Sequence, residues 1–378
     1  MFIYMGGTRL IKRRGLLKMA ATLSTGPFIL SRLHGSSGEL NLYSWSDYIY
    51  PDMLEDFQAK TGIQVNLSVY GSNDEALNKL RATQGFGFDL VMPSVVYGPS
   101  WNRYKLLQPL DESRINIDGC DPIMWSRSTA LGATYRRNRY LCPFNWGTEA
   151  LTWNRAERQL VYGEASFGDL WHPDNRGKVT VRAHSALLAI GLYLDRIGET
   201  PSDQMRITYD NEKDMRHVYA ACTAFAVKHK PWIRQFWSNA QQIQNAYLRN
   251  ACVIGQTWDG PAFRLADETE DEIGYVAPVE GALTWMDSMG IPSKATNVDQ
   301  AYEFINWYYQ PKSGAMHANN SGYNSCSYQS EKFLLTKAKE RFDQAYPGDA
   351  LERLWWYPPE APWFIAIRNE FRDQFLAA

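Results

Sequence analysis

The chain has 378 residues, of which 45% are hydrophobic and 21% are charged. This composition excludes a disordered chain, and the length is sufficient for two packed domains. The formal net charge is −2. Aromatic residues make up 14% of the chain, with 14 Trp and 22 Tyr. Core packing accounts for part of this excess, and the remainder offers many flat surfaces to a ligand.

The first 38 residues are predicted to be a twin-arginine export signal. Arg13-Arg14 precedes a modest apolar stretch that runs to Leu30 and is too short and too polar to span a bilayer. The alternative is a basic N-terminus of a cytosolic protein. The segment holds six basic residues and no acidic one, so its removal lowers the net charge to about −8. We expect an acidic, periplasmic mature protein, which suits a cationic ligand and argues against nucleic acid.

After residue 38 the pattern alternates between strands and helices. Strands are expected over 40–43, 63–70 and 88–92, and helices over 51–60 and 75–82. This β-α-β-α-β order predicts a parallel sheet covered by helices. Ligands of such sheets bind beyond the carboxyl ends of the strands, where Trp45, Asp47 and Ser94 fall.

The rest of the chain continues in the same style. Residues 140–153 are predicted to cross between two domains, because Pro143, Trp146 and Gly147 interrupt apolar runs there. Further strands are expected over 177–181, 252–258 and 273–279, helices over 186–196, 298–309 and from Trp363 onward, and a rigid loop over 355–359. No apolar run of the length needed to span a membrane follows the signal.

Three times a tryptophan lies beside an aspartate, or two places before one, at or just beyond an apolar stretch. The three pairs are Trp45-Ser46-Asp47, Trp258-Asp259 and Trp285-Met286-Asp287. An indole face attracts an ammonium group, and a carboxylate accepts a charge-assisted hydrogen bond from it. For any single pair, a core tryptophan next to a helix-capping aspartate is the simpler interpretation. Three such pairs together favour a pocket for an organic cation.

Motifs of enzymatic chemistry are absent from the sequence. It has no P-loop and no GxSxG elbow, and its six histidines have neither triad nor metal spacing. The five cysteines, Cys120, Cys142, Cys222, Cys252 and Cys326, form no CxxC pair, which argues against a zinc site. An oxidising compartment would allow one or two disulfides, whose pairing the sequence does not assign. We therefore expect no catalytic residue, no metal and no cofactor.

Five segments carry a resemblance to a known family. They are Leu42-Tyr43-Ser44-Trp45-Ser46-Asp47-Tyr48, Phe88-Asp89-Leu90-Val91-Met92-Pro93-Ser94, Pro143-Phe144-Asn145-Trp146-Gly147-Thr148, Trp285-Met286-Asp287-Ser288 and Gly322-Tyr323. Together they resemble the spermidine/putrescine-binding proteins, which are periplasmic receptors of polyamine ABC transporters. The resemblance implies an α/β, two-lobed periplasmic-binding-protein fold of type II. Each lobe would be a mixed, mainly parallel sheet flanked by helices, with the ligand in the cleft between the lobes.

By analogy with that family, the chain crosses between the lobes near residues 143, 285 and 331. The N-terminal lobe would then comprise residues 39–143 and 286–331, and the C-terminal lobe residues 144–285 and 332–378. The resemblance also implies the ligand-binding residues. They are Trp45, Asp47 and Tyr48 at the first strand, Ser94 at the third, Trp258 and Asp259 as one wall, and Trp285, Asp287 and Tyr323 at the amine end.

The sequence departs from the family where the far amine of a polyamine would bind. His184 and Leu187 occupy the places of the expected acids, and no acidic residue lies between Gly177 and Leu194. Arg182 is a possible contact for that end of the ligand, and a second ammonium there would meet a like charge. The alternatives are a surface arginine and a histidine that caps the following helix. A family tyrosine near Ser94 is also displaced, since Val96 stands there and Tyr97 follows.

These observations predict an exported solute-binding protein of an ABC importer, which binds a small linear amine such as putrescine or spermidine. The expected partners are that amine and a permease in the inner membrane, and the protein is expected to be a monomer. Because the far acids are missing, a ligand with one cationic end, such as 4-aminobutyrate, is the alternative. A periplasmic enzyme on the same scaffold and a receptor that only signals are the rival classes.

Overall fold

The computed structural model describes residues 38–378, so the predicted export signal lies outside the described residues. A small parallel sheet has the strand order β2-β1-β3 and consists of β1 (Gly38–Trp45), β2 (Ile63–Tyr70) and β3 (Leu90–Val91). Helices α1 (Pro51–Thr61) and α2 (Asn73–Ala82) connect these strands. The local signals explain these helices, because Gly62 ends α1 in the left-handed conformation and the Ser72 side chain caps α2.

The larger sheet has eight strands in the order β13-β11-β6-β9-β7-β8, with β10 and β12 also paired to β6. Its strands are β6 (Cys142–Asn154), β7 (Val179–Val181), β8 (Ile233–Phe236), β9 (Ile254–Trp258), β10 (Ile273–Val276), β11 (Leu283–Met289), β12 (Asn324–Ser325) and β13 (Trp355–Trp356). β6 pairs antiparallel with β9, β10, β11 and β12, whereas β7 pairs parallel with β8 and β9. This sheet is therefore mixed and less parallel than the resemblance implied, because the long β6 runs against all its neighbours.

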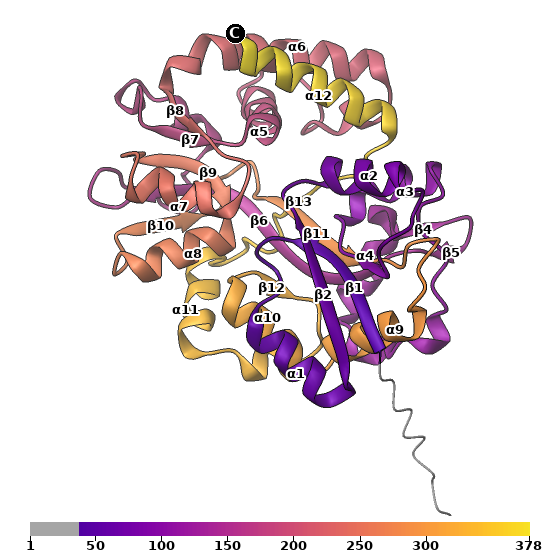
Figure 1. Cartoon of the computed structure of the whole chain (residues 1–378). Helices are drawn as coiled ribbons and strands as arrows, with labels where there is room; N and C mark the ends of the chain where they lie inside the picture. The colour runs from indigo at the N-terminus through magenta and orange to yellow at the C-terminus, as the bar shows by residue number, and fades with distance from the viewer. Residues whose placement is uncertain (1–37) are drawn as a thin grey trace, which may run out of the picture. The chain divides into compact units, whose positions relative to one another are not determined.

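β6 and β11 connect the small sheet to the rest of the larger sheet. The two strands pair from Leu283 opposite Glu149 to Met289 opposite Cys142. At its far end β11 also forms antiparallel bridges to the segment around β3, between Ser94 and Asp287 and between Val91 and Gly290. In Figure 1 both strands run from the group around β1 and β2 toward the group that carries α5, α6 and α12.

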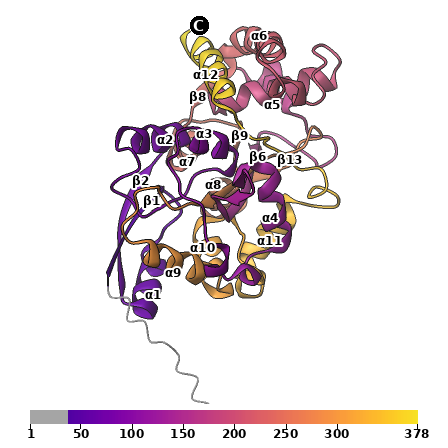
Figure 2. The same ribbon diagram turned by 90° about the vertical axis from the view of Figure 1, so that its right-hand side faces the viewer.

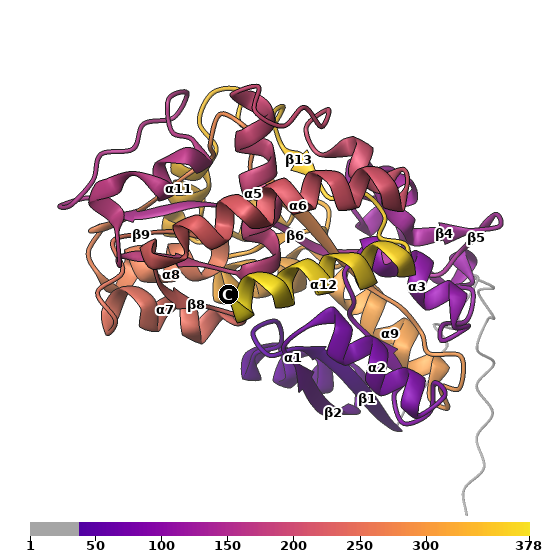
Figure 3. The same cartoon turned by 90° about the horizontal axis from the view of Figure 1, so that it is seen from above.

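Helices pack on both groups. Near the small sheet, α1 packs against α9 (Val298–Tyr308) and α10 (Pro311–Ser321). Around β7 and β8, α5 (Ala183–Arg196), α6 (Glu212–His229) and α12 (Pro362–Ala377) pack together, and Figures 2 and 3 show α12 alongside α6. The remaining elements are α3 (Gly98–Arg103), α4 (Pro122–Ser128), β4 (Thr134–Tyr135), β5 (Asn138–Arg139), α7 (Ala240–Leu248), α8 (Asp259–Glu268) and α11 (Thr336–Ala345).

All five cysteines are buried and free, so the structure contains none of the disulfides that an oxidising compartment would allow. Within residues 38–378 no helix has the length and apolar character needed to cross a membrane. In the same part of the chain, no cluster of three or more His, Cys, Asp or Glu side chains is arranged to hold a metal ion.

Candidate functional site

A cavity of about 860 Å³ lies between the small sheet and the group of α5, α7 and α12. Ten of the residues that the sequence singled out line it: Trp45, Asp47, Tyr48, Ser94, Arg182, His184, Trp258, Trp285, Asp287 and Tyr323. They come from the carboxyl ends of β1, β7 and β9, from β11, and from the segments after β3 and α10. The topology explains this meeting, because β11 carries its residues to the same edge at which the parallel strands of the small sheet end.

Asp287 is an enclosed acid of this cavity, with 2% of its surface exposed. The hydroxyl groups of Tyr48 and Ser94 each donate a hydrogen bond to one of its carboxylate oxygens. The Asn73 side chain in turn holds Ser94, through a 2.8 Å bond to its hydroxyl and a 2.9 Å bond from its backbone N–H. The β11 strand and the β3 end thus fix the position of the carboxylate between them.

Asp47 lies just beyond β1 and is partly exposed to the cavity. The Tyr323 hydroxyl donates a 2.9 Å hydrogen bond to Asp47 Oδ2, and the Arg264 guanidinium lies 4.0 Å from the same oxygen. Burial is the main cause that raises the pKa of Asp47, although Arg264 and Tyr323 oppose it. Burial also raises the pKa of Asp287 to about 7, against the hydrogen bonds from Ser94 and Tyr48. A cation that entered between these two acids would add a counter-charge for Asp287, which has no ion pair among residues 38–378, and would supplement Arg264 at Asp47.

Aromatic rings form the walls around the two acids. The ring centroid of Trp45 lies 6.1 Å from that of Tyr48 and 6.4 Å from that of Trp258. Tyr323 is 5.6 Å from Tyr48 and 5.1 Å from Trp285. The absence of a side chain at Gly147 on β6 leaves room for the indole of Trp285, because a Cβ on residue 147 would lie 2.5 Å from that ring. Such walls attract both an ammonium group and the methylenes attached to it.

Asp259, which the sequence also placed in the site, does not line the cavity. It is fully buried at the start of α8, where it accepts hydrogen bonds from the Thr148 N–H at 3.1 Å and the Tyr346 hydroxyl at 2.8 Å. Burial raises the pKa of Asp259 to about 7. In this structure its hydrogen bonds join α8, β6 and the end of α11 beside the cavity wall.

The other end of the cavity is formed by Arg182, His184, Trp237 and Glu149. The Arg182 guanidinium lies over the indoles of Trp258 and Trp237, 5.0 and 5.7 Å from their centroids. Burial lowers the pKa of His184 well below its usual value, and nearby arginines add to this, so its imidazole is neutral. Leu187, which takes the place of the second expected acid, is fully buried in α5 and does not reach the cavity.

Glu149 and Trp237 line the cavity and were missed from the sequence. Glu149 is 1% exposed in the middle of β6, and it accepts hydrogen bonds from Ser185 at 2.5 Å and Gln256 at 2.7 Å. Burial raises the pKa of Glu149 to about 7, opposed mainly by Arg182. The sequence held a signal for each residue, since Glu149 is the one acid in a 13-residue strand and Trp237 directly follows a strand.

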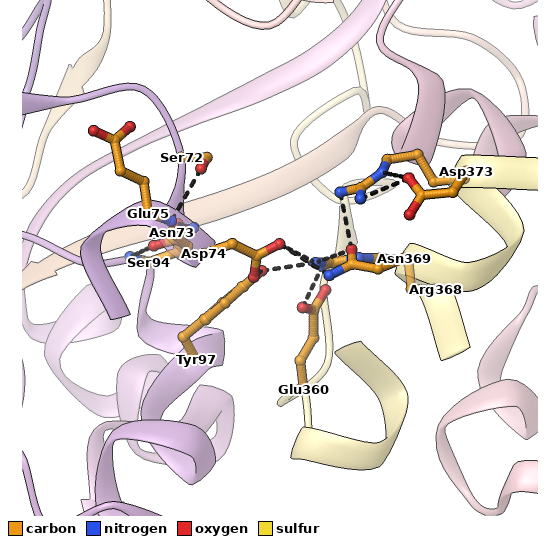
Figure 4. Close-up of polar contacts among 11 residues, drawn as sticks. Ser72, Asn73, Asp74, Glu75, Ser94, Tyr97, Glu360, Arg368, Asn369 and Asp373 are labelled. Carbon is orange, nitrogen blue, oxygen red and sulfur yellow. Dashed lines mark hydrogen bonds and ion pairs between the residues drawn. The ribbon is translucent and has the colours of Figure 1, made fainter. Parts of the chain in front are cut away.

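A polar network joins α2 to α12 across the rim of the cavity (Figure 4). Arg368 on α12 donates to Glu360 and to the Tyr97 hydroxyl, at 2.5 and 2.7 Å, and lies 3.6 Å from Asp74 on α2. Asn369 adds a 3.1 Å hydrogen bond to Asp74. Tyr97, the displaced tyrosine of the sequence, therefore contributes its hydroxyl to this network.

An aromatic cavity between two α/β groups, with one buried acid, one partly exposed acid and hydroxyl donors on both, is suited to enclose a small polar solute. The family model for bacterial extracellular solute-binding proteins matches residues 52–339, and the chain belongs to that family. It is a binding protein rather than an enzyme, as the sequence predicted.

The similar proteins are consistent with this assignment. The chain is 28% identical over 320 residues to the spermidine/putrescine-binding periplasmic protein of Escherichia coli K12, which covers 84% of this chain and 85% of that protein. It is 26% identical over 345 residues to the putrescine-binding periplasmic protein of the same organism, with 87% and 89% covered. A solved structure from Listeria monocytogenes, assigned to a spermidine/putrescine ABC transporter, has a TM-score of 0.74 and 25% identity over 89% of this chain and 98% of that one. These relationships confirm the predicted type II fold.

Proposed function

We propose that the protein captures a small linear amine in this cavity and delivers it to the permease of an ABC importer. The observation that carries the proposal is the pair of acids, Asp47 and Asp287, inside an aromatic enclosure. The amine would lie between them, with the rings of Trp45 and Trp285 against its methylenes. The relatives named above bind spermidine and putrescine, which supports a primary aliphatic amine as the recognised group.

The remaining predictions belong to the same proposal. They are export to the periplasm by a twin-arginine signal, action as a monomer, and lobes bounded near residues 143, 285 and 331. The ligand would be desolvated as the two groups of elements close on it, and the closed form would dock on the permease. Support for this order of events comes from β6 and β11, which connect the two groups and whose pairing is irregular between Asp287 and Ser288.

The proposal predicts that primary amines stabilise the protein and that Asp287 is required for this. A thermal-shift screen of the full chain with putrescine, spermidine, 4-aminobutyrate, agmatine and ornithine should raise the melting temperature for at least one compound. For the strongest binder, Asp287→Asn should weaken binding by about 2 kcal/mol or more, through loss of a charge-assisted hydrogen bond.

Asp299→Asn is the matched control, because Asp299 is a surface acid that pairs with Arg114, and 82% of its side chain is exposed. This variant should bind like the wild type. The proposal is wrong if no amine of the panel shifts the melting temperature. It is also wrong if Asp287→Asn binds the amine as well as the control does.

A further inference from the structure

The Arg182 guanidinium is a cation of the cavity that forms no close ion pair in the part of the chain that the structure describes. Among residues 38–378 no carboxylate oxygen lies within 4.0 Å of its nitrogens, and no protein acceptor receives a hydrogen bond from them. The side chain is partly exposed and lines the same cavity as Asp47 and Asp287. Its N–H groups are therefore available to a ligand.

The surroundings fix the guanidinium in place. Trp258 and Trp237 present their indole faces to it, and the Trp237 Nε1–H is itself tied to the Gln256 carbonyl at 2.9 Å. An arginine stacked in this way loses little further freedom when it binds, and its planar fork matches a carboxylate.

The acid at this end, Glu149, does not form a close ion pair with Arg182, although Arg182 opposes the rise in the pKa of Glu149 that burial causes. Glu149 is 1% exposed, and its Oε1 already accepts hydrogen bonds from Ser185 and Gln256. It makes no ion pair with Arg182 within 4.0 Å. Its pKa of about 7 means that a large fraction of it is neutral near neutral pH, which removes much of the repulsion toward a second carboxylate nearby.

The other two arginines near this end are paired with acids. Arg182, Arg368 and Arg372 all act on His184, whose imidazole is neutral. Arg368 is held by Glu360 and Asp74, and Arg372 pairs with Asp373 at 2.7 Å. Of these three arginines, Arg182 is the one without a close ion pair among residues 38–378. The second ammonium of a diamine would therefore lie near Arg182 without an unpaired carboxylate to bind.

We propose that the ligand is an ω-amino acid, whose ammonium lies between Asp47 and Asp287 and whose carboxylate binds the Arg182 guanidinium. This inference rests on the proposed function and names the chemistry of the ligand's second end. Trp45 and Trp258, in edge-to-face contact between the two ends, would cover the connecting methylenes. Arg182 is then the residue that determines specificity between amino acids and polyamines.

The test uses titration calorimetry on the full chain with 4-aminobutyrate, 5-aminopentanoate and 6-aminohexanoate. Each is compared with the alkylamine and the diamine of the same chain length. For the best length, the amino acid should bind about ten to a hundred times more tightly than the alkylamine, as expected for a charge-assisted contact. The diamine should bind no better than the alkylamine.

Arg182→Gln should remove the advantage of the amino acid over the alkylamine of the same length, and binding of the alkylamine by the variant shows that it is folded. Arg176→Gln is the control, because Arg176 likewise stacks on a tryptophan, Trp232, but is exposed and does not line the cavity. It should behave like the wild type.

The inference is overturned if the diamine binds more tightly than the amino acid, or if Arg182→Gln leaves the amino acid's affinity unchanged. Either result would leave the proposed function intact, since an amine would still bind. If neither amines nor amino acids bind the wild type, the proposed function itself fails.

Discussion

Two aspartates that look alike in the sequence have different surroundings in the structure. Trp285 and Asp287 are two residues apart on β11, and residues at this spacing point to the same face of a strand. Trp258 and Asp259 are adjacent, at the junction of β9 and α8, so their side chains diverge. Trp258 lines the cavity, whereas Asp259 is enclosed by hydrogen bonds beside it. The spacing between tryptophan and aspartate therefore indicated which aspartate shares the cavity with its tryptophan, whereas the presence of the pair alone did not.

The raised pKa of Asp287 predicts a pH dependence of amine binding. Burial holds the pKa at about 7 in the ligand-free protein, above the usual value of 3.8, so the carboxyl is largely protonated below neutral pH. An ammonium binds the ionised form. Affinity should therefore rise by up to tenfold per unit between about pH 5 and pH 7 and level off above that range. Calorimetry in two buffers of different ionisation enthalpy should detect proton release on binding.

The same pKa shift has the opposite sign for the stability of the ligand-free fold. Between about pH 4 and pH 7 the folded protein holds a proton on Asp287 that the unfolded chain has lost, so this contribution to stability decreases as the pH rises. Glu149 and Asp259 add to this trend, because their pKa values are raised to about 7 by burial as well. Comparing the pH dependence of stability in Asp287→Asn and in the wild type separates the contribution of Asp287 from that of Glu149 and Asp259.

For the binding prediction, an amine affinity that is constant from about pH 5 to pH 8 would contradict the assigned role of Asp287.

At the scale of elements, the first half of the chain followed its local signals closely. The strand predicted over 63–70 is β2, and the helix predicted over 51–60 is α1, which is one residue longer. Gly62 and Ser72 mark these boundaries through backbone conformation and side-chain capping, which depend on neighbouring residues only.

Elements that depend on distant partners were less predictable. Trp355 and Trp356 were expected in a loop because Pro358 and Pro359 follow, yet they form β13 by pairing in parallel with Leu283 and Thr284 on β11. No local pattern indicates a strand partner some 70 residues away.

Helix α6 was overlooked although its signal was present, since Met215, Val218, Tyr219 and Cys222 recur at helical spacing and are buried.

The contact between α2 and α12 predicts how the rim of the cavity affects ligand release. Asp74→Asn removes the charge that α2 offers to Arg368 and leaves the buried Arg368–Glu360 pair intact. Because 27% of the Asp74 side chain is exposed, we expect a modest loss of about 1 kcal/mol, or roughly a fivefold weaker affinity, through faster dissociation. Stopped-flow tryptophan fluorescence would measure this rate.

Glu370→Gln is the matched control for Asp74→Asn. Glu370 also lies on α12, but it pairs with Arg216 on α6, away from the cavity rim. Its loss should leave ligand dissociation unchanged. Equal dissociation rates for Asp74→Asn and the wild type would mean that the network in Figure 4 does not hold the rim closed.

For the molecule as a whole, the sequence predicted the two-lobed fold and most residues that line the cavity. The resemblance covered segments spread over the chain, and the topology brings them together at one edge. What it did not supply was the far end of the cavity, because Glu149 and Trp237 meet Arg182 only through the pairing of β6, β9, β7 and β8. The lobe boundaries remain a prediction.

The central claim is that an ammonium group binds between Asp47 and Asp287. The most direct measurement is a crystal structure of the full chain with the tightest-binding compound of the amine panel. We predict that the primary amine nitrogen lies at about 2.7–3.2 Å from an oxygen of Asp287 or Asp47, with its methylenes against Trp45 or Trp285. A ligand bound outside this cavity, or one that directs a neutral or anionic group toward Asp287, would contradict the account.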